Sequence, residues 1–150
     1  EWYAPYVAFA KRYGIANGYL DGTFRPEQPV SRAELVKLIA SYFTVEGGTS
    51  PFPDVPAGHW AAEVVSFAAE EGWVSGYLDG TFRPDAPVSR AEAVKILNHA
   101  LDRRAGERAA ALPFTDVEKG HWACDEIREA AVSHTYRKSG EGETWLTYER

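Results

Sequence analysis

The nine residues GYLDGTFRP at positions 18–26 decide the fold, because they return unchanged at positions 76–84. The two copies lie 58 positions apart (76 − 18). The four residues SRAE at positions 31–34 return at positions 89–92 with the same spacing. A pattern that repeats at one fixed period indicates tandem structural units that stack on one another.

A third copy begins but stops early. The leader FPDV at 52–55 reappears as FTDV at 114–117, and GHWA at 58–61 reappears at 120–123, both 62 positions later (114 − 52). Neither GYLDGTFRP nor SRAE occurs after that point. We therefore expect one domain over residues 1–150, with repeats at approximately 2–46 (its leader missing), 52–105 and 114–150 (degenerate).

Each full repeat is predicted to form a helix, an ordered loop and a second helix. The first helix of each repeat carries an apolar stripe at helical spacing. The two stripes contain Trp60, Val64, Phe67 and Ala68, and Trp2, Tyr6, Phe9 and Ala10. Glycines at 14 and 72 are placed where a left-handed residue would end each helix.

The second helix of each repeat has a strong start signal. Ser31 with Glu34, and Ser89 with Glu92, match a capping box, in which the serine hydroxyl and the glutamate each satisfy a backbone amide. The predicted buried stripes that follow contain Leu35, Leu38, Ile39, Tyr42 and Phe43, and Ala93, Ile96, Leu97, Ala100 and Leu101. Glycines at 47, 48 and 106 mark the breaks between repeats. Helices this short are marginal alone, so we predict a mainly α fold in which the repeats share a bundle.

Composition narrows the function. The net charge of −6 provides no basic face for nucleic acid, and no apolar run approaches the ~20 residues of a membrane helix, so we expect neither partner. The single cysteine rules out an internal disulfide framework or a cysteine-rich zinc site. The chain opens on Glu1 rather than Met, so we expect a processed or excised piece. No cofactor is expected.

The motifs F-x-D-V-x-x-G-H-W-A, G-Y-x-D-G-T-F-R-P and S-R-A-E, in this order, resemble the S-layer homology repeat of bacterial cell surfaces. The resemblance is strong over residues 2–101 and partial over 114–132. It implies a pseudo-threefold helical bundle, here with an incomplete third repeat. It also implies a secreted, non-catalytic module of the bacterial cell wall that binds secondary cell-wall polysaccharide, often through a pyruvylated sugar, or in some bacteria modified peptidoglycan.

Arg32 and Arg90 are the first candidates for such binding, because the family's arginine linked to ligand binding falls on them. Each is placed at the first helical position, beside the positive end of the helix dipole and its free amides. A planar guanidinium can hold a carboxylate, such as that of a pyruvyl ketal, in two parallel hydrogen bonds. The alternative is an ordinary surface ion pair.

The loops are the second candidate. The Asp-Gly pairs at 21–22 and 79–80 predict tight turns, with a structural role favoured for the aspartates. Phe24 and Phe82 are expected to plug the core. Arg25 and Arg83 either pair with nearby acids, which is favoured, or add positive charge to the groove. For the tyrosines, sugar binding and structure are equally supported. The loop residues proposed to bind ligand are Tyr19, Asp21, Gly22, Tyr77, Asp79 and Gly80.

The tryptophans at the helix starts, Trp2, Trp60 and Trp122, are expected to build the core, with one edge lining a groove. Trp60 is kept as a ligand-binding candidate on that basis. His59 and His121 precede two of these residues, but no third ligand recurs at metal spacing, so capping or surface roles are favoured over zinc. No pairing of a nucleophile with a base indicates catalysis.

The third repeat should differ from the others. Glu126 and Glu129 replace apolar positions in its helix, so that helix is expected to be more exposed. Residues 136–145 alternate β-favouring and turn residues and predict a short hairpin, with a disordered tail as the alternative. Either this tail or a second chain, forming a homodimer, would cover the open side. A protein–protein or self-assembly module is the alternative to anchoring.

Overall fold

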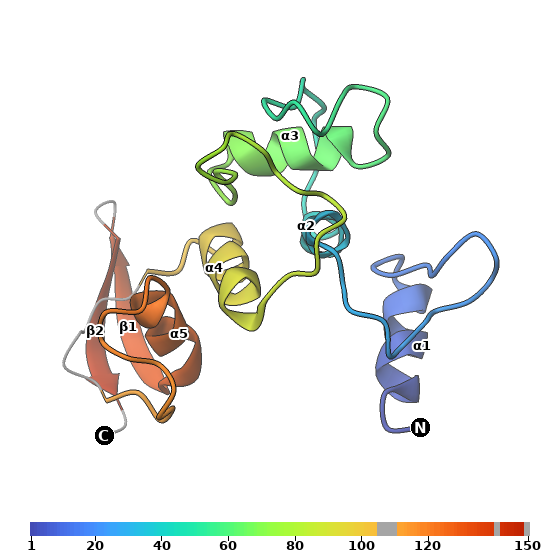
Figure 1. Ribbon diagram of the computed structural model, residues 1–150. Coiled ribbons are helices and arrows are strands. Elements are labelled where there is room, and N and C mark those ends of the chain that lie inside the picture. Colours follow the sequence, from blue (N-terminus) through green and yellow to red (C-terminus); the bar gives the residue numbers. More distant parts are fainter. Residues whose placement is uncertain (105–110, 140–141, 149–150) are drawn as a thin grey trace. The chain divides into compact units, whose positions relative to one another are not determined.

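The computed structural model describes residues 1–104, 111–139 and 142–148, and this part of the chain is mainly helical (Figure 1). The predicted α class and the C-terminal hairpin are confirmed. The expected break at Gly106 lies outside the described residues. The elements are α1 (Ala4–Arg12), α2 (Arg32–Ala40), α3 (Ala62–Glu70), α4 (Arg90–Ala100), α5 (Cys124–Ala131), β1 (His134–Ser139) and β2 (Gly142–Tyr148).

The chain divides into two compact units, one of Glu1–Glu70 with Val74–Val88 and one of Glu71–Trp73 with Ser89–Arg150. In the first unit α2 packs against α3, and in the second α4 packs against α5 (Figure 1). Each pair therefore joins the second helix of one sequence repeat to the first helix of the next. Each packed pair of helices therefore spans two sequence repeats and does not coincide with one of them. The bundle of three repeats stays a prediction.

The capping boxes predicted for the second helices are both present. Ser31 Oγ accepts a hydrogen bond from the Glu34 amide at 3.2 Å, and Glu34 Oε2 accepts one from the Ser31 amide at 2.8 Å. Ser89 and Glu92 repeat this geometry at 3.2 Å and 2.9 Å. These bonds satisfy amides that helical geometry leaves without partners, and they fix where α2 and α4 begin.

The leader of the second repeat packs against the loop at 76–84. Phe82 is fully buried with its ring 5.4 Å from that of Phe52. Asp54 accepts hydrogen bonds from the amides of Phe82 at 2.9 Å and of Arg83 at 2.7 Å. At Gly76, which has a φ of +70°, a Cβ atom would lie 2.6 Å from the Phe52 ring, so only glycine permits this approach.

The first loop and the third leader are more exposed than their counterparts in the second repeat. Phe24 is 40% exposed, so its predicted core role is wrong, whereas that of Phe82 is confirmed. Phe114 of the third leader is 46% exposed, and no GYLDGTFRP loop follows it. Within the described residues Phe52 and Phe82 bury each other, whereas Phe24 and Phe114 stay partly exposed.

The apolar stripe expected on the first helix of repeat 1 is not buried. α1 contains no buried residue, and Trp2, Tyr6 and Phe9 are 81%, 70% and 56% exposed. In the other repeats the corresponding helix packs against the capped helix of the repeat before it. Within the described residues α1 has no comparable packing, and its apolar stripe is exposed.

The buried faces of α2 and α4 overlap the predicted stripes in part, because Ile39, Ile96 and Ala100 are buried as predicted. The residues buried on α2 include Ala33, Val36, Ile39 and Ala40, and those on α4 are Ile96, Asn98 and Ala100. Tyr42 and Leu101, expected in the core, are 70% and 61% exposed. Both lie beyond the last helical residue, so they do not continue the face that the helical period assigned to them.

The hairpin covers α5. β1 and β2 pair in an antiparallel arrangement with an irregularity between Thr135 and Tyr136. Trp145 is 9% exposed, packs with Val132, and donates from Nε1 to Glu129 Oε2 at 3.0 Å. The expectation that Glu129 is exposed is therefore wrong: it is 4% exposed, because the hairpin lies over it and supplies a hydrogen-bond donor. A homodimer through this region stays a prediction.

Candidate functional site

The two repeated loops are rigid in the way their turn signals predict. Asp79 accepts hydrogen bonds from the hydroxyl and amide of Thr81 at 2.6 and 3.0 Å, and from Arg83 at 2.9 Å. Asp21 has the same partners in Thr23 and Arg25. The threonine hydroxyl first, and then the guanidinium, hold the pKa of each aspartate well below its usual range. These acids organise the loop.

The loop arginines and glycines also have structural roles. Arg25 and Arg83 adopt left-handed backbones with φ of +56° and +60°, and each guanidinium lies 4.0 Å from the ring centre of its own loop's tyrosine. Gly22 and Gly80 have φ of +82° and +78°, as the predicted turns require. The turn glycines and left-handed arginines therefore fix the backbone conformation of each loop, and the arginine guanidinium packs over the tyrosine ring.

Tyr19 connects its loop to the capped helix. Its hydroxyl donates to Glu34 Oε1 at 2.7 Å, and this bond raises the pKa of Tyr19. Burial alone would raise the pKa of Glu34, but hydrogen bonds from Tyr19 and from Ser31 outweigh it and hold that pKa below its usual value. The capping role expected for Glu34 is present, with the tyrosine as an additional donor.

Arg32 is enclosed rather than exposed. It is 6% exposed, its Nε donates to the Phe82 carbonyl at 3.0 Å, and its guanidinium lies 4.8 Å from the centre of the Tyr77 ring. The amides expected to be free beside it are in use: those of Arg32 and Ala33 donate to the carbonyls of Ala86 and Pro84, both at 3.0 Å. The expectation of open amides at this helix start is wrong, because the turn at residues 84–86 covers them.

Arg90 has different surroundings. It is exposed, and within the described ranges neither its side chain nor the amides of Arg90 and Ala91 have a hydrogen-bond partner. Residues that would correspond to the loop covering Arg32 are missing from the third repeat. Of the two candidate arginines, Arg90 is the one that presents a guanidinium at a capped helix start to solvent.

The tryptophans are the clearest departure from the predicted core. Trp2, Trp60 and Trp122 are 81%, 54% and 60% exposed. A lysine ammonium lies over two of the rings: Lys37 Nζ is 5.3 Å from the centre of Trp60, and Lys95 Nζ is 5.8 Å from Trp122. These distances suit a cation–π contact. Each unit therefore displays an indole ring beside a cation.

Sequence reasoning missed the two lysines and Asp54. Lys37 and Lys95 are in register, 58 positions apart (95 − 37), and this spacing was available as a signal. Asp54 also recurs, as Asp116 of the third leader. Its role in binding the loop amides depends on a contact across 28 residues, which no local pattern indicates.

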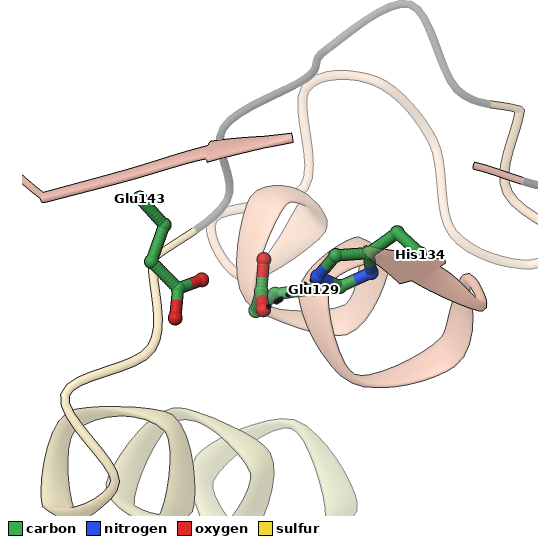
Figure 2. A group of neighbouring side chains, drawn as sticks. All are labelled: Glu129, His134 and Glu143. Atoms are coloured by element: carbon green, nitrogen blue, oxygen red, sulfur yellow. Dashed lines mark ion pairs between the residues drawn. The ribbon is translucent and has the colours of Figure 1, made fainter. Parts of the chain in front are cut away.

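Two histidine predictions can be compared with the geometry. Nδ1 of His59 accepts from the Ala61 amide and Nδ1 of His121 from the Ala123 amide, both at 3.1 Å, which is the capping role favoured from the sequence. The described part of the chain brings one set of potential metal ligands together elsewhere, in the second unit. This set is Glu129, His134 and Glu143 (Figure 2).

Comparison with known proteins matches this chain to the family described as "S-layer homology domain" over residues 1–36 and 51–94. The chain belongs to the S-layer homology family. Among similar proteins of Acetivibrio thermocellus, cell surface glycoprotein 1 is 34% identical over 97% of this chain, and a cellulosome-anchoring protein is 34% identical over 95% of it. S-layer protein EA1 of Bacillus anthracis is 35% identical over 71% of this chain and 13% of its own length.

The chain spans 7% of the length of the glycoprotein and 33% of that of the anchoring protein. The chain is an S-layer homology module, and these relatives are a cell surface glycoprotein, a cellulosome-anchoring protein and an S-layer protein. In the described residues, no helix is both long and apolar enough to cross a membrane.

Proposed function

We propose that this module is a non-catalytic anchor that binds an acidic cell-wall polysaccharide, with a pyruvylated sugar as the recognised unit. The observation that carries the proposal is the exposed tryptophan with a lysine beside it, present once in each unit as Trp60 with Lys37 and Trp122 with Lys95. A sugar ring packs its apolar face on an exposed indole, and the ammonium attracts the carboxylate of the ketal.

Arg90 is proposed as the second cation for the carboxylate. Its exposed guanidinium and the unpartnered amides at the start of α4 suit an anion. Arg32 is proposed to act indirectly, because its contacts with Phe82 and Tyr77 hold the second loop against α2. Tyr19, Asp21, Gly22, Tyr77, Asp79 and Gly80 are proposed to shape the surface around the sugar.

The test is retention of the 150-residue chain by purified pyruvylated wall polysaccharide, with the depyruvylated polymer as the ligand control. We expect the double substitution Trp60→Ala and Trp122→Ala to weaken binding about tenfold, equivalent to ~1.4 kcal/mol. Arg90→Ala should reduce binding to the pyruvylated polymer and leave binding to the depyruvylated polymer unchanged. Modified peptidoglycan is tested as a third ligand, and retention by it alone would identify peptidoglycan instead of the polysaccharide as the wall component bound.

Trp2→Ala is the matched control, because Trp2 occupies the same repeat position and is more exposed, but within the described ranges no lysine lies over its ring. Equal losses for Trp2→Ala and Trp60→Ala would contradict a role for the lysine-paired rings. Full retention by the depyruvylated polymer would contradict the proposed ketal recognition.

Self-assembly is the second candidate, and the exposed stripe of α1 supports it. Trp2, Tyr6 and Phe9 form an apolar face that a second copy of the chain could cover. This function predicts concentration-dependent association in sedimentation without glycan, reduced by Phe9→Ser. A monomer at high concentration that still binds polysaccharide would exclude self-assembly and keep anchoring.

A further inference from the structure

Three potential metal ligands meet between α5 and the hairpin, outside the S-layer homology motifs. Glu129 comes from α5, His134 from β1 and Glu143 from β2. Their side chains are only 1%, 3% and 0% exposed. One ligand atom from each lies within 4.8 Å of the other two, and Figure 2 shows the Glu143 carboxylate extending toward Glu129 and His134.

The guanidinium of Arg103 lies among these three side chains. Arg103 Nη2 is 2.6 Å from Glu129 Oε1 and 2.9 Å from His134 Nε2, and Arg103 Nε is 2.9 Å from Glu143 Oε1. The N–H directions fit these oxygens poorly. Within the described residues, Arg103 Nε, Glu129 Oε1 and both Glu143 oxygens have no hydrogen-bond partner although they are buried. Buried carboxylate oxygens in this state are costly.

Two buried carboxylates share this space with one guanidinium and one imidazole. His134 Nδ1 donates to the Val132 carbonyl at 2.7 Å. Its Nε2 lies on the other side of the ring, 3.2 Å from Glu129 Oε1 and 2.9 Å from Arg103, so it is directed into the cluster. Buried carboxylates depend on the cations placed beside them.

The ligands also have the outer hydrogen bonds that orient metal ligands in proteins. Trp145 Nε1 donates to Glu129 Oε2 at 3.0 Å, which leaves Glu129 Oε1 directed into the cluster. The Val132 carbonyl fixes the tautomer of His134, and the Trp145 ring stacks on the imidazole with centres 3.8 Å apart. In metal sites the ligating histidine usually donates its other N–H to a carbonyl or carboxylate, and a ligating carboxylate usually accepts a further hydrogen bond.

We propose that Glu129, His134 and Glu143 bind a divalent transition-metal ion such as Zn²⁺, and that the Arg103 side chain moves out as the ion enters. Imidazole nitrogen with carboxylate oxygen suits Zn²⁺ or Mn²⁺, and a water molecule completes four ligands. A +2 ion in place of the guanidinium balances both carboxylates. Arg103 is 27% exposed, so its path to solvent is short. The ion fastens the hairpin to α5.

The test is titration of the chelator-treated 150-residue chain with ZnCl₂ in a calorimeter, together with its melting temperature. We expect one Zn²⁺ per chain and a higher melting temperature. Glu143→Gln and Glu129→Gln should each weaken binding at least about tenfold, since losing an outer partner alone costs about 10–100-fold. Trp145→Phe removes only the hydrogen-bond donor to Glu129, so it should weaken Zn²⁺ binding by about 10–100-fold.

Two further variants separate metal binding from a purely structural cluster. Glu126→Gln removes an acid from the same helix outside the cluster and should leave Zn²⁺ affinity unchanged. Arg103→Gln removes the competing cation and should tighten Zn²⁺ binding, whereas a structural ion pair predicts no gain. Circular dichroism checks folding: if Arg103→Gln loses structure without metal, recovery on adding Zn²⁺ supports the site.

Three results would overturn the site: no binding heat with ZnCl₂, unchanged affinity in Glu143→Gln, or no effect of Zn²⁺ on unfolded Arg103→Gln. Binding that is lost only on His59→Ala or His121→Ala would also overturn it, because those histidines lie on other elements. Polysaccharide retention measured with and without ZnCl₂ is an independent readout, so this proposal and the anchoring function can fail separately.

Discussion

Arg32 and Arg90 occupy the same repeat position but should respond differently to removal. Arg32→Ala deletes a buried side chain that donates to the Phe82 carbonyl, so we expect a loss of about 1.5–3 kcal/mol in unfolding free energy, typical of hydrogen bonds to charged groups. Arg90→Ala changes an exposed residue and should have the small effect of an ordinary surface substitution. Urea denaturation of both variants measures the difference, and equal losses would contradict it.

Asp54 is the residue that holds the second loop in place. Asp54→Ala leaves the amides of Phe82 and Arg83 without acceptors, and we expect a loss of about 1–3 kcal/mol in unfolding free energy. Asp116→Ala is the matched control, since Asp116 has the same leader position but is exposed and has no such loop to hold. Urea denaturation should show a loss of unfolding free energy for Asp54→Ala and none for Asp116→Ala. If Asp54→Ala is as stable as the parent chain, the hydrogen bonds from Asp54 do not hold the loop.

At the scale of elements, the capped helix starts are the features that sequence reasoning identified best. Ser89→Ala removes the acceptor for the Glu92 amide and should cost about 0.5–2 kcal/mol in unfolding free energy. The measurement is thermal unfolding followed by circular dichroism at the helix band. Ser75→Ala, at an exposed position outside the helices, is the control and should melt with the parent chain. A Ser89→Ala variant as stable as the control would argue against the box.

The helices and loops of the repeats have equal sequences but unequal burial. The loop at 76–84 is packed by Phe52 and Asp54, whereas the identical loop at 18–26 is exposed. α3 and α5 pack on capped helices, whereas α1 has no buried residue. In a repeat array each unit contributes to the core of its neighbour, so identical sequences can differ in burial.

For the whole molecule, the shifted carboxyl groups predict sensitivity to acid. The pKa values of Asp21, Glu34, Asp54 and Asp79 all lie below their usual range in the folded chain. Their contribution is therefore fully present above the unfolded value of about 4 and is lost as the pH falls through the lower folded values. The urea midpoint should drop between pH 7 and pH 3, and a constant or rising midpoint would contradict this.

The sequence by itself determined the elements that depend on local interactions. The capping boxes, the Asp-Gly turns with positive φ, and the hairpin after α5 were predicted because neighbouring residues satisfy one another's backbone groups. The repeat motifs also determined the family. These signals lie within a few positions along the chain, so a local pattern is sufficient to recognise them.

Only the tertiary structure decided which repeated residues are buried and which groups meet. It placed Arg32 under the second loop and left Arg90 exposed, and it put the tryptophans on the surface beside Lys37 and Lys95. It buried Glu129 against Trp145 and brought His134 and Glu143 to it. The reason is physical: burial and charge compensation depend on what a neighbouring element supplies, and identical motifs with different neighbours have different environments.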